Sequence, residues 1–114
     1  MDKLGEILVH KNVISSYIGH AVNETSGIVG TCALSLKDGF YKLLKKENIT
    51  DGINIKIKNN EVIVDVHIIT IYGIPILNIT DNLLKTIQYY MNHYVGLYKY
   101  TINIFVEKLK FVEK

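Results

Sequence analysis

Residues 53–68, INIKIKNNEVIVDVHI, decide the fold. Apolar and polar side chains alternate on both sides of Asn59-Asn60, as in two strands that each bury one face. Asparagine tolerates the positive φ of a tight turn, so these residues predict a two-residue hairpin turn. That turn places Ile53 opposite Val66 and matches apolar with apolar and polar with polar residues. The sequence therefore predicts an antiparallel hairpin with one consistent register.

Hydrophobic periodicity on either side of the hairpin predicts the other elements. In chain order they are a short strand at residues 6–10, a helix from Asn12 to about Thr25, a strand at 28–34, a short helical piece at 38–46, a helix capped by Asn78 or Thr80 and ended at Gly96, and a strand from 98 to about 110. Each long helix carries an apolar stripe and is expected to bury it. The stripes consist of Val13, Ile14, Tyr17, Ile18, Ala21 and Val22 in the first helix, and of Leu83, Leu84, Ile87, Met91, Tyr94 and Val95 in the second.

The order strand-helix-strand-hairpin-helix-strand predicts an α+β fold, a single mixed β-sheet with two main helices packed on one face. The second helix connects the strand at 62–72 to the last strand. A right-handed crossover of this kind makes the two strands parallel neighbours. The chain has 114 residues, the size of one compact domain, so residues 1–114 are expected to form a single domain.

Composition limits the classes of function. Polar residues, glycine and proline interrupt the apolar run at 62–77, so we expect no transmembrane segment there. The first residues lack the features of a secretion signal, so we expect a cytoplasmic protein. The net charge is +2, and all 13 basic residues are lysines. Arginine makes most bidentate contacts to bases and phosphates, so its absence argues against sequence-specific nucleic-acid recognition. The single cysteine, Cys32, has apolar neighbours and is expected to be a buried, reduced thiol.

Catalytic, metal and cofactor sites have little support in the sequence. Asp65 and His67 point to one strand face and could form a carboxylate–imidazole pair, but no nucleophile accompanies them. The histidines lack the spacing of a zinc site. They are His10, His20, His67 and His93. We therefore expect no enzyme activity, no metal and no cofactor.

One short motif keeps RNA binding as an alternative. Gly27-Ile28-Val29-Gly30 matches the GXXG loop with which KH domains clamp single-stranded RNA. In KH domains that loop lies between two helices with basic flanks, whereas here a strand is expected to follow. A turn that starts a strand accounts for these glycines better.

Two surfaces are candidates for interactions. The first is the sheet face that the helices leave open, and its expected members are Ile63, Asp65, His67, Ile69, Ile71 and Phe105. An apolar patch there predicts self-association, unless the tail at 109–114 or the segment around Phe40 covers it within one chain. The second is a basic turn that could contact an anionic surface, although a solvated charged face is the simpler interpretation. Its residues are Lys42, Lys45 and Lys46.

Several short motifs, taken together, resemble a known family. They are Glu24-Thr25-Ser26-Gly27-Ile28 after the first helix, Gly52-Ile53 before the hairpin, Val62-Ile63-Val64-Asp65-Val66 within it, Tyr72-Gly73 with Ile76 and Ile79, and Gly96-Leu97 before Ile102-Asn103-Ile104-Phe105-Val106. Their order and spacing resemble the alkaline shock protein family of Gram-positive bacteria, which are small envelope-stress proteins.

The resemblance implies a non-enzymatic cytoplasmic scaffold or adaptor that helps the cell tolerate envelope stress. Such a protein self-associates and docks on a membrane-embedded partner at the inner face of the cell membrane. The resemblance brings no catalytic residues. What is known of similar proteins also suggests an alternative, a regulator that binds an enzyme of lipid metabolism.

Overall fold

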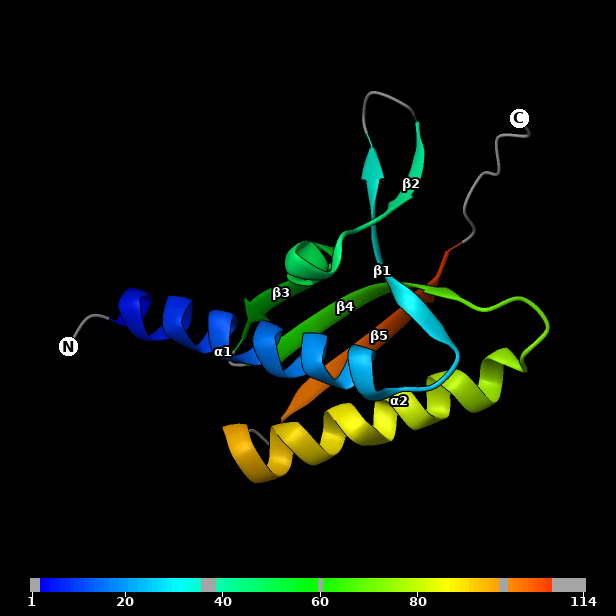
Figure 1. The fold of residues 1–114 in the computed structure, drawn as a ribbon. Coiled ribbons are helices and arrows are strands. Elements are labelled where there is room, and N and C mark those ends of the chain that lie inside the picture. Colours follow the sequence, from blue (N-terminus) through cyan, green and yellow to red (C-terminus); the bar gives the residue numbers. More distant parts are fainter. Residues whose placement is uncertain (1–2, 36–38, 60, 97–98, 108–114) are drawn as a thin grey trace.

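The structure, a computed structural model, describes residues 3–35, 39–59, 61–96 and 99–107. Its elements follow one another along the chain as shown in Figure 1. They are helix α1 (Lys3–Glu24), strands β1 (Ile28–Ser35) and β2 (Phe40–Leu43), the 3₁₀ helix η1 (Lys46–Gly52), strands β3 (Ile53–Lys58) and β4 (Glu61–Thr70), helix α2 (Ile76–Tyr90), the π-helical turn η2 (Met91–Val95) and strand β5 (Tyr100–Val106).

Strand β4 is the centre of one mixed sheet. It pairs antiparallel with β3 along its first half and antiparallel with β1 near its end, while β5 runs parallel to it. Val66 pairs with both Ile53 of β3 and Ile104 of β5, so β3 and β5 lie on opposite sides of β4. The predicted α+β class, the single mixed sheet and the parallel crossover are confirmed.

The hairpin has the register that the sequence predicts. Ile53 pairs with Val66, and the ladder continues to Lys58 opposite Glu61. Asn59 has a φ of 53°, the positive value expected in the turn. Asn60 lies outside the described residues.

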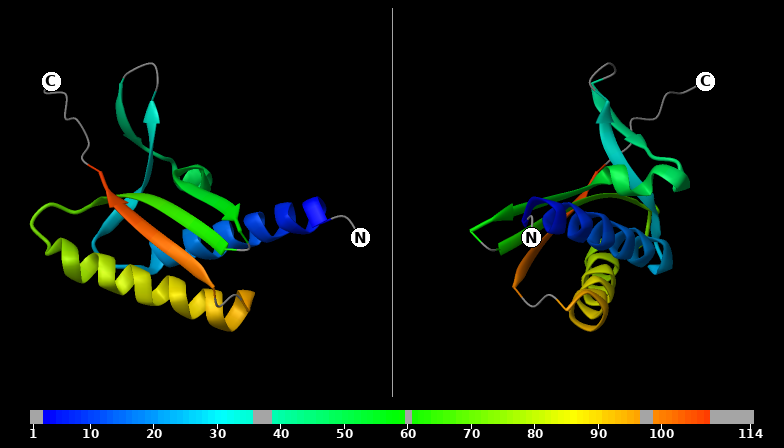
Figure 2. Two further views of the ribbon diagram at one scale, coloured as in Figure 1. Left: turned by 180° about the vertical axis from the view of Figure 1, so that it is seen from behind. Right: turned by 90° about the vertical axis from the view of Figure 1, so that its left-hand side faces the viewer.

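The core lies between the sheet and both long helices, which cover the same sheet face (Figure 2). It consists of Ile14, Ile18, Ala21 and Val22 of α1, Leu83 and Ile87 of α2, Met91, and Ile53, Val62, Val64, Val66 and Ile68 of the sheet. Two members of the expected stripes are exposed instead. Val13, at the margin of its stripe, is 41% exposed, and Tyr94, in the π-helical turn η2 that follows α2, is 58% exposed.

Two predicted elements are wrong. The strand expected at 6–10 is part of α1. No turn signal separates it from the helix, and extending a nucleated helix costs less than starting another element. The helical piece expected at 38–46 is instead strand β2, followed by the start of η1. Gly39 has a φ of 72°, and β2 then pairs antiparallel with the second half of β1.

The ends of α2 differ in how well the sequence places them. The helix begins at Ile76 after Pro75, rather than at a cap by Asn78 or Thr80. Proline has the φ of a first helical turn and lacks an amide that would stay unpaired there. At the other end, α2 continues into η2, and Gly96 caps η2 with a φ of 75°, the left-handed cap that was expected.

Candidate interaction surfaces

The parallel register of β4 and β5 brings most of the predicted open-face residues together. His67 pairs with Phe105, and their rings stack with centroids 4.8 Å apart. Ile63 and Asp65 precede His67 on the same strand face and are half-buried. These side chains line the sheet face opposite the helices.

Two further residues were expected on this face, and they differ in exposure. Ile69 is only 6% exposed. It lies on β4 opposite Gly30 of β1 and is buried. Ile71 follows the end of β4 and is 48% exposed in the next loop. The contiguous isoleucine patch inferred from alternation alone is therefore smaller than expected, and its role in association stays a prediction.

The polar side chains of the face are paired across β4 and β5. Asn103 donates from Nδ2 to Oδ1 of Asp65 at 3.0 Å. Nδ1 of His67 lies 3.1 Å from Oε1 of Glu107, and its ring also stacks on Tyr41. The carboxylate next to His67 is thus Glu107 and not Asp65. Sequence reasoning missed Glu107 because finding it requires the β4–β5 register.

Cys32 is a buried thiol, as expected. It is fully shielded from solvent and forms no disulfide. Burial and the nearby charge of Glu107 raise the pKa of its thiol to about 11. The thiol therefore stays protonated near neutral pH, which makes it a poor nucleophile.

A tyrosine surface lies where α1 meets the end of α2. We use this name for Tyr17, Tyr89, Tyr90 and Tyr94 together with Glu24. Tyr17 stacks on Tyr94 at 5.7 Å and lies 5.6 Å from Tyr90, measured between ring centroids. Tyr89 is 51% exposed and Tyr94 is 58% exposed. The sequence analysis missed this surface because it assigned Tyr17 and Tyr94 to buried stripes.

Glu24 links the two helices at the tyrosine surface. Its carboxylate accepts a hydrogen bond from the Tyr90 hydroxyl and lies 2.8 Å from Nε2 of His20. The bond to Glu24 is the main reason that the pKa of Tyr90 rises to about 12. A hydrogen bond with Tyr89 is the main cause that raises the pKa of Tyr94. These contacts hold the rings in fixed positions relative to one another.

A second exposed apolar region comprises the connection before α2 and the first turn of that helix, at its opposite end from η2 (Figure 1). Tyr72 is 101% exposed and Leu77 is 77% exposed. Ile71, Ile74 and Ile76 are also exposed. The signal in the sequence is the apolar run around Gly73 and Pro75, two residues that interrupt regular structure.

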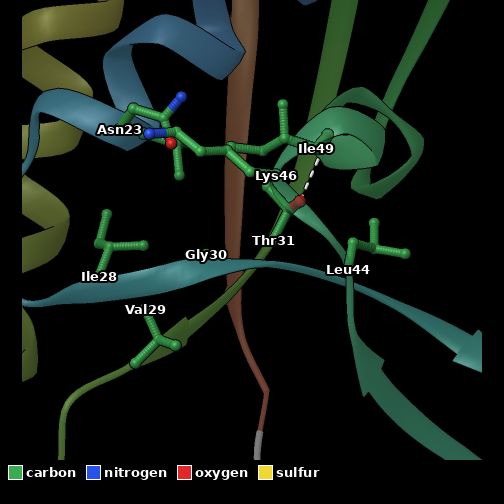
Figure 3. A pocket seen from close by; sticks show the side chains of 9 residues that line it. Asn23, Ile28, Val29, Gly30, Thr31, Leu44, Lys46 and Ile49 are labelled. Carbon is green, nitrogen blue, oxygen red and sulfur yellow. Dashed lines mark hydrogen bonds between the residues drawn. The ribbon is translucent and has the colours of Figure 1, made fainter.

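The three candidate lysines do not share a helical turn. Lys42 lies on β2, Lys45 precedes η1, and Lys46 is its first residue; all three are exposed. Lys46 and Asn23 border a small pocket between the end of α1, β1 and η1 (Figure 3). The pocket measures about 230 Å³, below the size of ordinary small-molecule sites. Thr31 at its wall already donates to the carbonyl of Ile49 at 2.7 Å.

Other sites considered from the sequence have no structural support in the described residues. No cluster of three or more His, Cys, Asp or Glu residues is placed to hold a metal ion there. The glycine motif is a turn, with Gly27 at a φ of 92°, and β1 begins at the next residue. Within the same residues, no helix is long and apolar enough to cross a membrane.

Comparisons with known proteins support a family assignment. The chain is 30% identical to the Bacillus subtilis protein YloU over 109 residues, 95% of this chain and 91% of that protein. It is 31% identical to the Streptococcus pyogenes protein Spy1614 over 111 residues, 96% of this chain and 92% of that protein. It is also 25% identical over 113 residues to a stress response regulator gls24 homolog of Streptococcus pyogenes, covering 96% of this chain and 62% of that protein.

No solved structure matches the chain. The model of the alkaline shock protein 23 family, described by a cell envelope-related function, matches residues 1–111. This match covers nearly all of the sequence and agrees with the resemblance inferred from the motifs. The chain belongs to the alkaline shock protein 23 family of cell envelope-related general stress proteins.

Proposed function

We propose that the protein is a non-enzymatic adaptor of the cell-envelope stress response. It works in the cytoplasm at the inner face of the membrane, where its tyrosine surface docks on a membrane-embedded partner, and it self-associates. The observation that carries this proposal is the cluster of four tyrosine rings on adjacent helices, two of them more than half exposed. The envelope-related function of the family and the relatives named as stress response regulators support the cellular role.

Exposed tyrosines that are held in place suit a docking surface. Tyrosine contributes a large contact area and has few rotatable bonds, so it loses little conformational entropy on binding. Tyrosine is also enriched among the residues that dominate the binding energy of protein interfaces. Here Tyr90 is fixed by its bond to Glu24, and Tyr94 by stacking on Tyr17. The surface is therefore organised before a partner arrives.

The partner segment is proposed to be basic. Lysine and arginine are concentrated in the cytoplasmic loops of membrane proteins, next to the membrane spans. Cations bind to the faces of tyrosine rings, and Glu24 adds a negative charge at the same place. A basic segment next to a span would thus meet complementary chemistry on the tyrosine surface.

The open sheet face supports docking less well. Asp65 pairs with Asn103 and His67 with Glu107, so its polar groups satisfy one another. The lysines at positions 42, 45 and 46 are spread over a strand, a connection and a 3₁₀ helix, and give at most a weak attraction to anionic lipid. Direct docking on a protein accounts better for a membrane location.

Fractionation of the native host tests the proposal. A tagged wild-type protein is expected in the membrane fraction, and a Tyr89→Ala/Tyr94→Ala double variant is expected to move to the soluble fraction. Tyr72→Ala is the matched control, because Tyr72 is fully exposed at the other end of α2. Circular dichroism of the purified variants checks that the fold is kept. A wild-type protein found only in the soluble fraction, or a double variant that stays with the membrane, would refute the proposal.

A further inference from the structure

Among the described residues, one edge of strand β5 has no neighbouring strand. The amide of Glu107 donates to the carbonyl of Ile68 at 2.9 Å. This bond determines which residues of β5 point their N–H and C=O groups toward β4. Residues with odd numbers therefore direct their backbone groups toward β4. The even-numbered residues, Tyr100, Ile102, Ile104 and Val106, direct theirs away from it. In the described part of the chain, β5 pairs with β4 alone.

This edge lacks the usual protection against pairing. Tyr100–Val106 contains no charged residue, no proline and no glycine. Strands β2 and β3, which stand at the two ends of the strand order, carry lysines: Lys42 in β2, and Lys56 and Lys58 in β3. Charges and proline are the devices by which edge strands avoid pairing with other chains. Strand β5 is thus the edge that accepts another strand more readily.

The edge is also held rigid. On the open face of the sheet, Thr101 donates to Glu61 at 2.7 Å and Asn103 donates to Asp65 at 3.0 Å. The ring of Phe105 stacks on His67. Three side chains in alternate positions therefore fix β5 to the central strand. A strand that pairs with β5 therefore does not have to order it first.

We propose that a second copy of this chain pairs with β5 in antiparallel orientation, so that the two sheets become one. The proposal rests on the self-association that belongs to the proposed function. The strands are centred on Asn103, which faces Asn103 of the second copy. Ile102 then pairs with Ile104, and Tyr100 with Val106. These even-numbered residues direct their backbone groups outward, so each such pair exchanges two hydrogen bonds.

Charge complementarity selects this register. Centring on Asn103 places Lys99 opposite Glu107 of the second copy, and the arrangement repeats at the other end of the paired strands. Opposite charges in facing positions stabilise a pair of strands, whereas like charges destabilise it. If the pairing is centred one residue earlier or later than Asn103, Lys99 no longer faces Glu107 of the second copy. Between residues 99 and 107, no like charges face one another in the central register.

The apolar side of β5 supports the same arrangement. Ile102 and Ile104 pack against the core but are only half-buried, because the sheet ends with their strand. In the proposed pair, Ile102 of one copy lies beside Ile104 of the other on the side of the helices. Neighbouring isoleucines then shield the margin of each core from water.

A cysteine scan tests the register in the full-length chain. Facing residues of a non-hydrogen-bonded antiparallel pair have Cα atoms about 4.5 Å apart, within the range of a disulfide. Asn103→Cys is expected to give a disulfide-linked dimer under mild oxidation. Thr101→Cys is the matched control, since it faces Phe105 and lies roughly 13 Å from its own copy. The native Cys32 is buried and is not expected to interfere.

Sedimentation measures the association without a cross-link. Asn103→Lys places two lysines opposite one another and is expected to weaken the dimer at least about tenfold. Asn54→Lys is the control, because Asn54 pairs with the same Asp65 from the other side of β4. Association that is unaffected by Asn103→Lys, or equal cross-linking of both cysteine variants, would refute the β5 interface while leaving self-association intact. A wild-type protein that stays monomeric at high concentration would refute the interface, whereas membrane docking is tested separately by fractionation.

Discussion

Nδ1 of His67 lies 3.1 Å from Oε1 of Glu107, although 40 positions separate the two residues in the chain. Both side chains are about four-fifths shielded from solvent, at 20% and 21% exposure. The contact joins the residue that follows β5 to the middle of β4, and it extends the cross-strand pairs of the open face. It depends entirely on the parallel register of the two strands.

Removal of this contact is expected to lower stability. Glu107→Ala should reduce the free energy of unfolding by about 1 kcal/mol, the usual value of a part-buried side-chain hydrogen bond. Glu107→Gln keeps an oxygen acceptor and should lose less. Urea unfolding followed by circular dichroism measures both variants. An unchanged transition midpoint for Glu107→Ala would show that the pair contributes nothing.

The thiol of Cys32 is expected to resist modification in the folded protein. Burial and the charge of Glu107 raise its pKa to about 11, so the thiolate is scarce at about pH 8. A thiol reagent such as Ellman's should react slowly with native protein and rapidly after denaturation. The folded state gains stability from this raised pKa below the usual thiol pKa of about 9 and loses it as the pH rises through about 11. Rapid reaction of the native protein would contradict the buried position.

Tyr90 is expected to ionise later than an ordinary tyrosine. Its hydrogen bond to Glu24 raises the pKa to about 12, so the bond stabilises the fold below about pH 10 and is lost as the pH approaches 12. Ultraviolet absorbance should show one late-titrating phenol fewer in Tyr90→Phe than in the wild type. Glu24→Gln should move the titration of Tyr90 back toward its usual range. Identical titration curves for all three proteins would contradict the link between the helices.

Gly52 is expected to tolerate no side chain. A Cβ atom there would lie 2.7 Å from Cβ of Thr31 and 2.9 Å from the carbonyl oxygen of Cys32. Because β1 would have to move, Gly52→Ala should cost roughly 1–3 kcal/mol of stability. Asn54→Ala, at an exposed position two residues later, is the control and should change little. Thermal unfolding measures both, and equal stability of Gly52→Ala and wild type would refute the close approach.

Patterns of neighbouring residues correctly predicted the hairpin register and the helix end, because local sequence determines both. The alternation on both sides of Asn59 fixed the hairpin register, because a one-residue slip would expose its apolar side chains. The helical stripe and Gly96 predicted where the helical segment of α2 and η2 ends. The segment at 38–46 failed, because a short apolar run with lysines fits a strand as well as a helix. Pairing with β1 decides between the two, and that contact is distant in sequence.

The candidate surfaces were harder to predict than the fold. Strand alternation predicted an exposed Ile69, but this side chain is only 6% exposed where β4 pairs with β1. Helical periodicity predicted a buried Tyr94, whereas the π-helical turn η2 places it on the surface beside Tyr17. The contact of Glu107 with His67 could be identified only once the register of β4 and β5 was known. Each of these depends on how elements meet, which a single sequence does not specify.

Site-specific photocross-linking in the native host tests the central claim most directly. A photoreactive phenylalanine analogue replaces Tyr94 in one variant and Tyr72 in the control, and both positions are exposed. We expect the analogue at position 94 to form a cross-link to an integral membrane protein, through a segment rich in lysine or arginine. The analogue at position 72 should not capture that protein. Absence of any membrane protein at position 94, or equal capture of the same protein from both positions, would contradict docking through the tyrosine surface.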